Sequence, residues 1–144
     1  MNAVKVRRRI LDEHATLRHK MAAARTAPNV ATLRRALVDL ADALHAHSLS
    51  EEEVMRELFP DLDGWGHRPL RFDEHVTEHR LMCDALVLAS TLEEDAIVTA
   101  TRLILDRIHD HMDREERVLL ADDVLSRVTR PHPRGVRIRA SRHP

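Results

Sequence analysis

Apolar residues recur every three or four positions along four stretches of the chain, and charged residues fill the faces between them. This spacing is that of one face of an α-helix. The pattern predicts four helices, over residues 4–25, 29–58, 70–89 and 92–125. Pro28 and Asn29 break the pattern between the first two, and the Gly- and Pro-containing stretch FPDLDGWGHRP ends the second. Four amphipathic helices joined by short links indicate an all-α, up-down-up-down four-helix bundle.

All four stripes that should face the interior of this bundle contain residues that a protein core normally excludes. These residues are His14, His47, Glu51, His75, His79, His111 and Glu115. Burying an unpaired carboxylate costs several kcal/mol, so polar groups that converge in a core need a partner. A bound cation is the simplest partner, whereas a metal-free interaction module would leave these groups unsatisfied. By contrast, His45 and His109 lie about 200° round the helix from His47 and His111 and should face outward.

The interior polar residues come in two similar halves. LDEHATLRH at 11–19 parallels FDEHVTEHR at 72–80, and HAHSLSEEEVM at 45–55 parallels HDHMDREERVL at 109–119. The repeat therefore predicts two helical hairpins that share one site. Residues four apart lie one turn apart on the same helix face, so each HxxxE pair can share a metal. His79 is the exception because its counterpart is Arg18. Without His79 as a ligand, the site would be symmetric, with two histidines per metal.

These motifs resemble those of the haemerythrin-like family, also called the HHE cation-binding domain. The resemblance covers about residues 10–120 and rests on DEH, HSLSEE followed by LFP, EHVTEH and HMDREE. It implies a non-haem di-iron centre within a four-helix bundle, in which an oxo or hydroxo group also joins the two iron ions. By position, it implies that one iron is held by His75, His79 and His111 and the other by His14 and His47, with Glu51 and a carboxylate of the last helix as bridges.

The last predicted helix departs from the family pattern at the bridging position. Haemerythrins proper have an aspartate five residues after the histidine of this helix, and Glu116 stands at that spacing here. Glu115 instead matches Glu51 in the repeat and falls on the apolar stripe. We therefore favour Glu115 over Glu116 as the bridge.

The first two predicted helices would place His14 and His47 at different heights along the bundle axis. His14 lies 14 residues before Pro28, and His47 lies 19 residues after it. At the helical rise, the five-residue difference separates the two histidines by roughly 7 Å along the bundle. The loop between the helices, or fraying of the first turn of the second helix, is expected to absorb this offset.

The predicted ligand set narrows the chemistry. Imidazole and carboxylate ligands without thiolate favour iron, with manganese or zinc as weaker alternatives. If both carboxylates and a solvent oxygen bridge the pair, one iron has six ligands and the other five. The open position would take a small molecule such as O₂, peroxide or nitric oxide. Reversible binding or sensing, a catalase- or peroxidase-like or NO-reducing enzyme, and iron storage are all compatible with it. The chain has no Tyr, which excludes a tyrosyl-radical enzyme.

Composition restricts the setting in which the protein works. The 144 residues suffice for one domain. Its single cysteine, Cys83, excludes an internal disulfide and a cysteine-based metal site, and favours the cytoplasm. The sequence contains no run of eighteen apolar residues, so we expect no membrane contact.

Charge is unevenly distributed along the chain. Residues 1–126 carry 17 basic against 24 acidic side chains, a net charge of −7, whereas six Arg and no acid follow from Arg127 onward. We expect a helical domain over 1–126 and a basic, disordered tail over 127–144. The tail is expected to neutralise the acidic body or to contact an acidic protein partner, in preference to nucleic acid.

Overall fold

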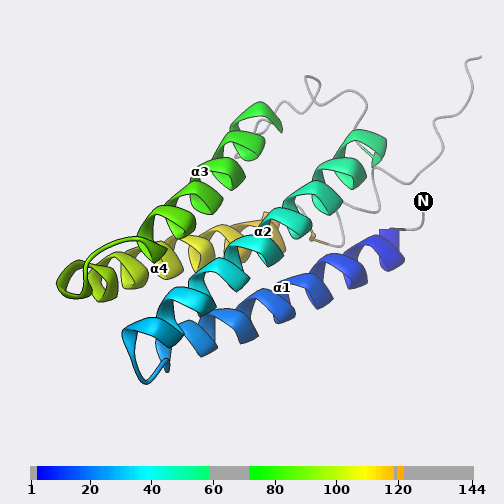
Figure 1. Ribbon diagram of the computed structural model, residues 1–144. Coiled ribbons are helices and arrows are strands. Elements are labelled where there is room, and N and C mark those ends of the chain that lie inside the picture. Colours follow the sequence, from blue (N-terminus) through cyan, green and yellow to red (C-terminus); the bar gives the residue numbers. More distant parts are fainter. Residues whose placement is uncertain (1–2, 59–71, 119, 122–144) are drawn as a thin grey trace, which may run out of the picture.

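The computed structural model describes residues 3–58, 72–118 and 120–121 of the chain. The described residues form four α-helices: α1 (Ala3–Arg25), α2 (Val30–Leu58), α3 (Phe72–Ser90) and α4 (Glu94–Val118). Successive helices run in opposite directions and lie side by side as a bundle (Figure 1). The predicted all-α bundle is therefore confirmed, while the proposed tail at 127–144 lies outside the described residues. None of the described helices is both long and apolar enough to cross a membrane.

The start of α2 is well defined. The backbone N–H of Thr32 donates to the Asn29 side-chain oxygen at 2.8 Å, so Asn29 caps the helix. The first turn of α2 is therefore intact, and the expectation that it could fray to absorb the offset between His14 and His47 is wrong.

The end of α4 differs from the prediction. The apolar pattern predicts a helix to residue 125, but α4 ends at Val118. The N–H of Leu120 donates to the Glu115 carbonyl at 3.0 Å, a turn that closes helix C-termini. Arg7 on α1 then donates to the Leu120 carbonyl at 2.9 Å. These two bonds fix Leu120 against α1, and its apolar side chain is buried there.

Among the described residues, the apolar core forms two clusters of unequal size. The large cluster contains fifteen buried residues, which come from all four helices. On α1 it begins at Leu17, and on α4 it ends at Met112. The small cluster contains Val6, Ile10, Val54 and Leu120. The buried histidines and glutamates lie next to one end of the large cluster. On α1 and α2 they lie between the large and the small cluster.

Two neighbouring leucines on α3 test this packing. Leu86 is 0% exposed within the large cluster, whereas Leu88 is 65% exposed. We expect Leu86→Ala to lower the free energy of unfolding by about 2–5 kcal/mol because it leaves a cavity. Leu88→Ala should change it by about 0.5 kcal/mol or less. Urea denaturation of both variants measures the difference, and equal losses would contradict the described rotation of α3.

Candidate metal centre

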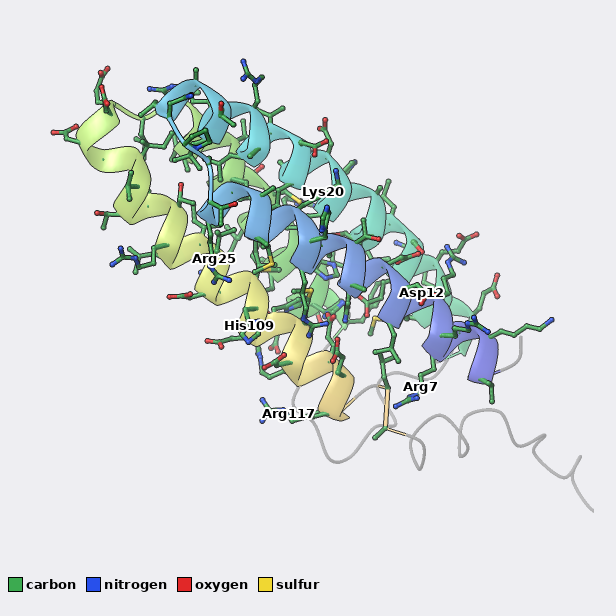
Figure 2. The ribbon with its side chains drawn as sticks, turned by 90° about the horizontal axis from the view of Figure 1, so that it is seen from below. Arg7, Asp12, Lys20, Arg25, His109 and Arg117 are labelled. Atoms are coloured by element: carbon green, nitrogen blue, oxygen red, sulfur yellow. The ribbon has the colours of Figure 1, made fainter. Side chains whose placement is uncertain are left out.

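The seven polar residues that the sequence places inside the bundle are all buried. Their exposed fractions are 0% for His14, 3% for His47, 1% for Glu51, 0% for His75, 1% for His79, 1% for His111 and 0% for Glu115. The expected contrast is also present, because His45 and His109 are exposed. Figure 2 shows His109 on the outer side of α4. The structure thus gathers the predicted residues in one layer across the bundle.

Helical spacing explains how each helix supplies this layer. His47 and Glu51 on α2 are four residues apart, as are His111 and Glu115 on α4, so each pair occupies one face. His75 and His79 form the corresponding pair on α3. Helix α1 contributes only His14, since Arg18, one turn later, binds carboxylates of α4 instead.

The rings of His14 and His47 lie close together, although the two residues are at different distances from the α1–α2 turn. Their ring centroids are 4.9 Å apart. Side chains on a helix lean toward its N-terminus. In this antiparallel pair, His14 therefore leans away from the turn and His47 leans toward it. Because His47 is the residue farther from the turn, both leanings bring the two rings together.

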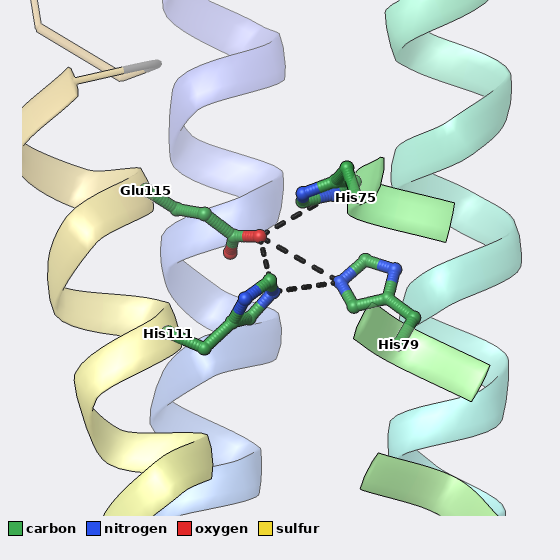
Figure 3. A group of neighbouring side chains, drawn as sticks. All are labelled: His75, His79, His111 and Glu115. Carbon is green, nitrogen blue, oxygen red and sulfur yellow. Dashed lines mark hydrogen bonds and ion pairs between the residues drawn. The ribbon is translucent and has the colours of Figure 1, made fainter. Parts of the chain in front are cut away.

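Glu115 lies at the centre of the layer and has imidazoles on both sides. Its Oε1 atom is 3.3 Å from His75 Nε2 and 3.6 Å from His79 Nε2. The same oxygen also contacts His111 Nε2 at 2.5 Å (Figure 3). Its other oxygen, Oε2, is 3.1 Å from His14 Nε2. The two carboxylate oxygens thus face different groups of histidines.

Glu51 approaches the same layer from α2. Its Oε2 atom is 3.1 Å from His75 Nε2 and 3.4 Å from His79 Nε2. It is also 3.5 Å from His47 Nε2, on the other side of the layer. Both buried carboxylates therefore stand between the α3–α4 histidines and the α1–α2 histidines.

The buried ligand atoms fit metal ions better than they fit one another. Nε2 of His79 and Nε2 of His111 are only 2.8 Å apart. Both oxygens of Glu115 and the Nε2 atoms of His14 and His47 have no partner of correct hydrogen-bond geometry among the described residues, although they lie at ion-pair distances. These atoms are therefore placed so that an ion between them could bind several of them at once. Three sets of ligand atoms each lie within 4.8 Å: His75–His79–His111–Glu115, His14–His47–Glu115 and His47–Glu51–His79.

The charge of the ligands also suits cations. Burial raises the pKa of Glu115, but contacts with His111, His14 and His79 outweigh it and hold the pKa well below its ordinary value. Glu115 is therefore an anion at neutral pH, as a metal-binding carboxylate must be. The donor set contains only nitrogen and oxygen. The described chain thus holds a buried His/Glu cluster suited to a pair of metal ions.

A second ring of carboxylates lies behind three of the histidines. The contacts are Glu13 Oε2 to His47 Nδ1 at 2.9 Å, Glu116 Oε1 to His14 Nδ1 at 2.8 Å, and Glu78 Oε2 to His111 Nδ1 at 3.3 Å. Glu116, which the sequence left as the alternative bridge, therefore contacts the outward nitrogen of His14. The contact with His111 lowers the pKa of Glu78 to about 2. Hydrogen bonds from Arg18 and His14 likewise outweigh burial and lower the pKa of Glu116.

Sequence reasoning missed Glu13 and Glu78. Each stands immediately before an interior histidine, His14 or His79, and so lies about 100° round the helix on its flank. That position places each carboxylate beside the histidine of a neighbouring helix. The EH pairs at 13–14 and 78–79 were therefore the available signal.

Comparison with known proteins agrees with this geometry. The family model described as the Hemerythrin HHE cation binding domain matches residues 6–122. The matched range includes all four helices except the first turn of α1, and all seven buried polar residues. No curated protein and no solved structure gives a significant match.

Two histidines of α4 provide a matched test of the cluster. Adding Co²⁺ to the metal-free protein should raise its Tm, because a metal that binds only the folded chain adds its binding energy to stability, about 2.7 kcal/mol at 100 times Kd. His111→Ala removes a buried donor and should abolish most of this shift. His109→Ala, two residues away and exposed, should retain it. Equal shifts in the two variants, measured by differential scanning fluorimetry, would contradict metal binding at the cluster.

Proposed function

This chain belongs to the hemerythrin HHE cation-binding domain family, and we propose that its buried cluster binds two iron ions that bind or react with a small molecule. O₂, peroxide and nitric oxide are the candidates. The observation that carries the proposal is the position of Glu115, whose two oxygens face separate histidine groups. A carboxylate in this position can bridge two ions, which a site for a single ion does not require.

We assign the ligands by their distances. One ion would be held by His75, His79 and His111, and the other by His14 and His47, with Glu51 and Glu115 shared between them. His79 belongs to this set because its Nε2 lies close to both carboxylates. When bound, an iron pair of this kind supplies up to two electrons and an open ligand position for a small molecule.

The ligand chemistry supports iron over a structural zinc ion. Five imidazoles and two carboxylates exceed the four ligands of a structural zinc site, which often include sulfur. Cys83 offers no thiolate, since it packs against the large apolar cluster and burial raises its pKa to about 11. The metal ligands are therefore nitrogen and oxygen only.

The surroundings of the cluster support reversible binding or sensing ahead of enzymatic turnover. A catalase- or peroxidase-like or NO-reducing reaction needs proton delivery. Two titratable groups beside the cluster residues of α4, Glu116 and His109, make other contacts. Glu116 contacts both His14 and Arg18, and His109 lies outside the bundle within 3.3 Å of Asp113. Iron storage is a further alternative, which iron stoichiometry distinguishes because a store holds far more than two ions per chain.

Iron content and absorption test the proposal directly. Protein produced in iron-supplemented medium should contain about two irons per chain, as the number of ligands requires. It should show near-ultraviolet bands that bleach with dithionite. A spectrum that returns on adding O₂ and reverses on removing it indicates a carrier or sensor, whereas sustained consumption of peroxide or nitric oxide indicates an enzyme.

Two histidines of α2 serve as the control pair. His47→Ala should lose iron and thermal stability together, because it removes a buried ligand. His45→Ala, which changes an exposed histidine two residues away, should keep the iron content of the unchanged protein. Full iron in the His47→Ala protein, or a single zinc ion and a silent spectrum in the unchanged one, would overturn the assignment.

A further inference from the structure

We propose that Glu13, Glu78 and Glu116 are positioning residues, each of which holds one ligand histidine in the tautomer that turns Nε2 toward the metal. The inference rests on the proposed function and deepens it. In neutral imidazole one nitrogen carries the proton and the other can bind a metal. A carboxylate that accepts a hydrogen bond from Nδ1–H therefore leaves Nε2 free as the ligand atom.

Each of the three contacts crosses from one helix to another. Glu13 on α1 reaches His47 on α2, Glu78 on α3 reaches His111 on α4, and Glu116 on α4 reaches His14 on α1. In every case the opposite ring nitrogen, Nε2, faces Glu51 or Glu115. Each outer carboxylate thus fixes the rotation of one histidine ring and the distance between its own helix and the helix that carries the ring.

Each outer carboxylate is itself held by an arginine. Arg9 Nε lies 3.2 Å from Glu13 Oε1, Arg114 donates to Glu78 Oε1 at 2.6 Å, and Arg18 donates to Glu116 Oε1 at 2.8 Å. Ser50 on α2 adds a hydrogen bond to Glu13 at 2.8 Å. Glu13 and Glu78 therefore use one oxygen for the histidine and the other for the arginine, which limits rotation of the carboxylate. The three positions repeat one arrangement of histidine, glutamate and arginine.

The arrangement is unequal across the two proposed metal positions. Among the described residues, the Nδ1 atoms of His75, His79 and His111 have no partner of hydrogen-bond geometry, but that of His111 lies at ion-pair distance, 3.3 Å, from Glu78 Oε2. The position held by His14 and His47 thus has a carboxylate behind each histidine, whereas the other position has one, behind His111. Glu13 and Glu116 should therefore act on one ion and Glu78 on the other.

Titration with Co²⁺ tests this division. Glu78→Gln should weaken the binding of one of the two Co²⁺ ions about 10–100-fold and leave the affinity for the second unchanged. This range is typical of residues that orient a metal ligand. Glu78→Ala, which also removes the hydrogen-bond acceptor, should weaken it further. Glu13→Gln should weaken the binding of the other ion. The double variant Glu13→Gln, Glu78→Gln should therefore bind both ions more weakly. Glu53→Gln, at an exposed site on α2, is the control and should bind both ions as the unchanged protein does.

The histidine tautomers give a second measurement that does not depend on affinity. In ¹⁵N-histidine NMR of the Zn²⁺-loaded protein, we expect His111 to carry its proton on Nδ1 and to keep it in Glu78→Gln. In Glu78→Ala the Nδ1 signal of His111 alone should shift, because the carboxylate beside it is gone. A residue that only supports the fold would lower the Tm without this selective change. Arg114→Ala, which keeps Glu78 but frees it to rotate, should weaken the same ion less than Glu78→Ala.

The outcomes separate this inference from the proposed function. If the unchanged protein binds two Co²⁺ and Glu78→Ala binds both equally well with the His111 tautomer unchanged, the positioning role is wrong and the metal site stands. If the unchanged protein binds no Co²⁺ and no iron, the proposed function fails. The tautomer of His47 in the metal-free protein, compared with that in Glu13→Ala, then still decides whether the carboxylate fixes the ring.

Discussion

The structure depends on placing two carboxylates and five imidazoles in the middle of a small helical bundle. Glu115 illustrates the constraint, since it is fully buried and lies among imidazole nitrogens that do not meet it with good hydrogen-bond geometry. A buried group in this state destabilises the folded chain unless another charge compensates it. Bound cations remove that penalty, so the free energy of metal binding is also free energy of folding. The four helices are therefore held together by apolar contacts on either side of a polar layer whose stability should depend on bound cations.

The two halves of the chain are similar, and one position at which they differ decides how many imidazoles each half brings to the buried cluster. His79 on α3 lies at ion-pair distance from Glu51 in the centre, while its counterpart Arg18 on α1 binds Glu116 and Asp113 outside it. One half thus contributes an additional imidazole, and the other contributes a cation that orders an outer carboxylate. A duplicated pair of hairpins that kept both residues the same would give a symmetric centre. The substitution makes the two proposed metal positions chemically different.

The sequence predicted the four helices, the interior positions and the family, because helical spacing and repeated HxxxE pairs are local properties of the chain. The contrast between buried His47 and exposed His45 follows from the same spacing. Glu13 and Glu78 were missed, and Glu116 was considered only as a bridge, because the partners of these carboxylates lie on other helices. Pairing across helices depends on rotations that periodicity does not specify. The end of α4 was also misplaced, since Leu120 continues the apolar pattern but reaches its cluster through a closing turn. The rings of His14 and His47 meet in spite of the expected offset, and the lean of their side chains, which a count of residues ignores, favours this contact.

The two apolar clusters lie on either side of the polar layer and differ in size. Among the residues that the structure describes, fifteen buried side chains lie in the large cluster and four in the small one. Regions with few buried apolar contacts open more often than the whole molecule unfolds. Amide hydrogens beside Leu40 or Leu86, inside the large cluster, are therefore expected to exchange with solvent only when the four helices separate.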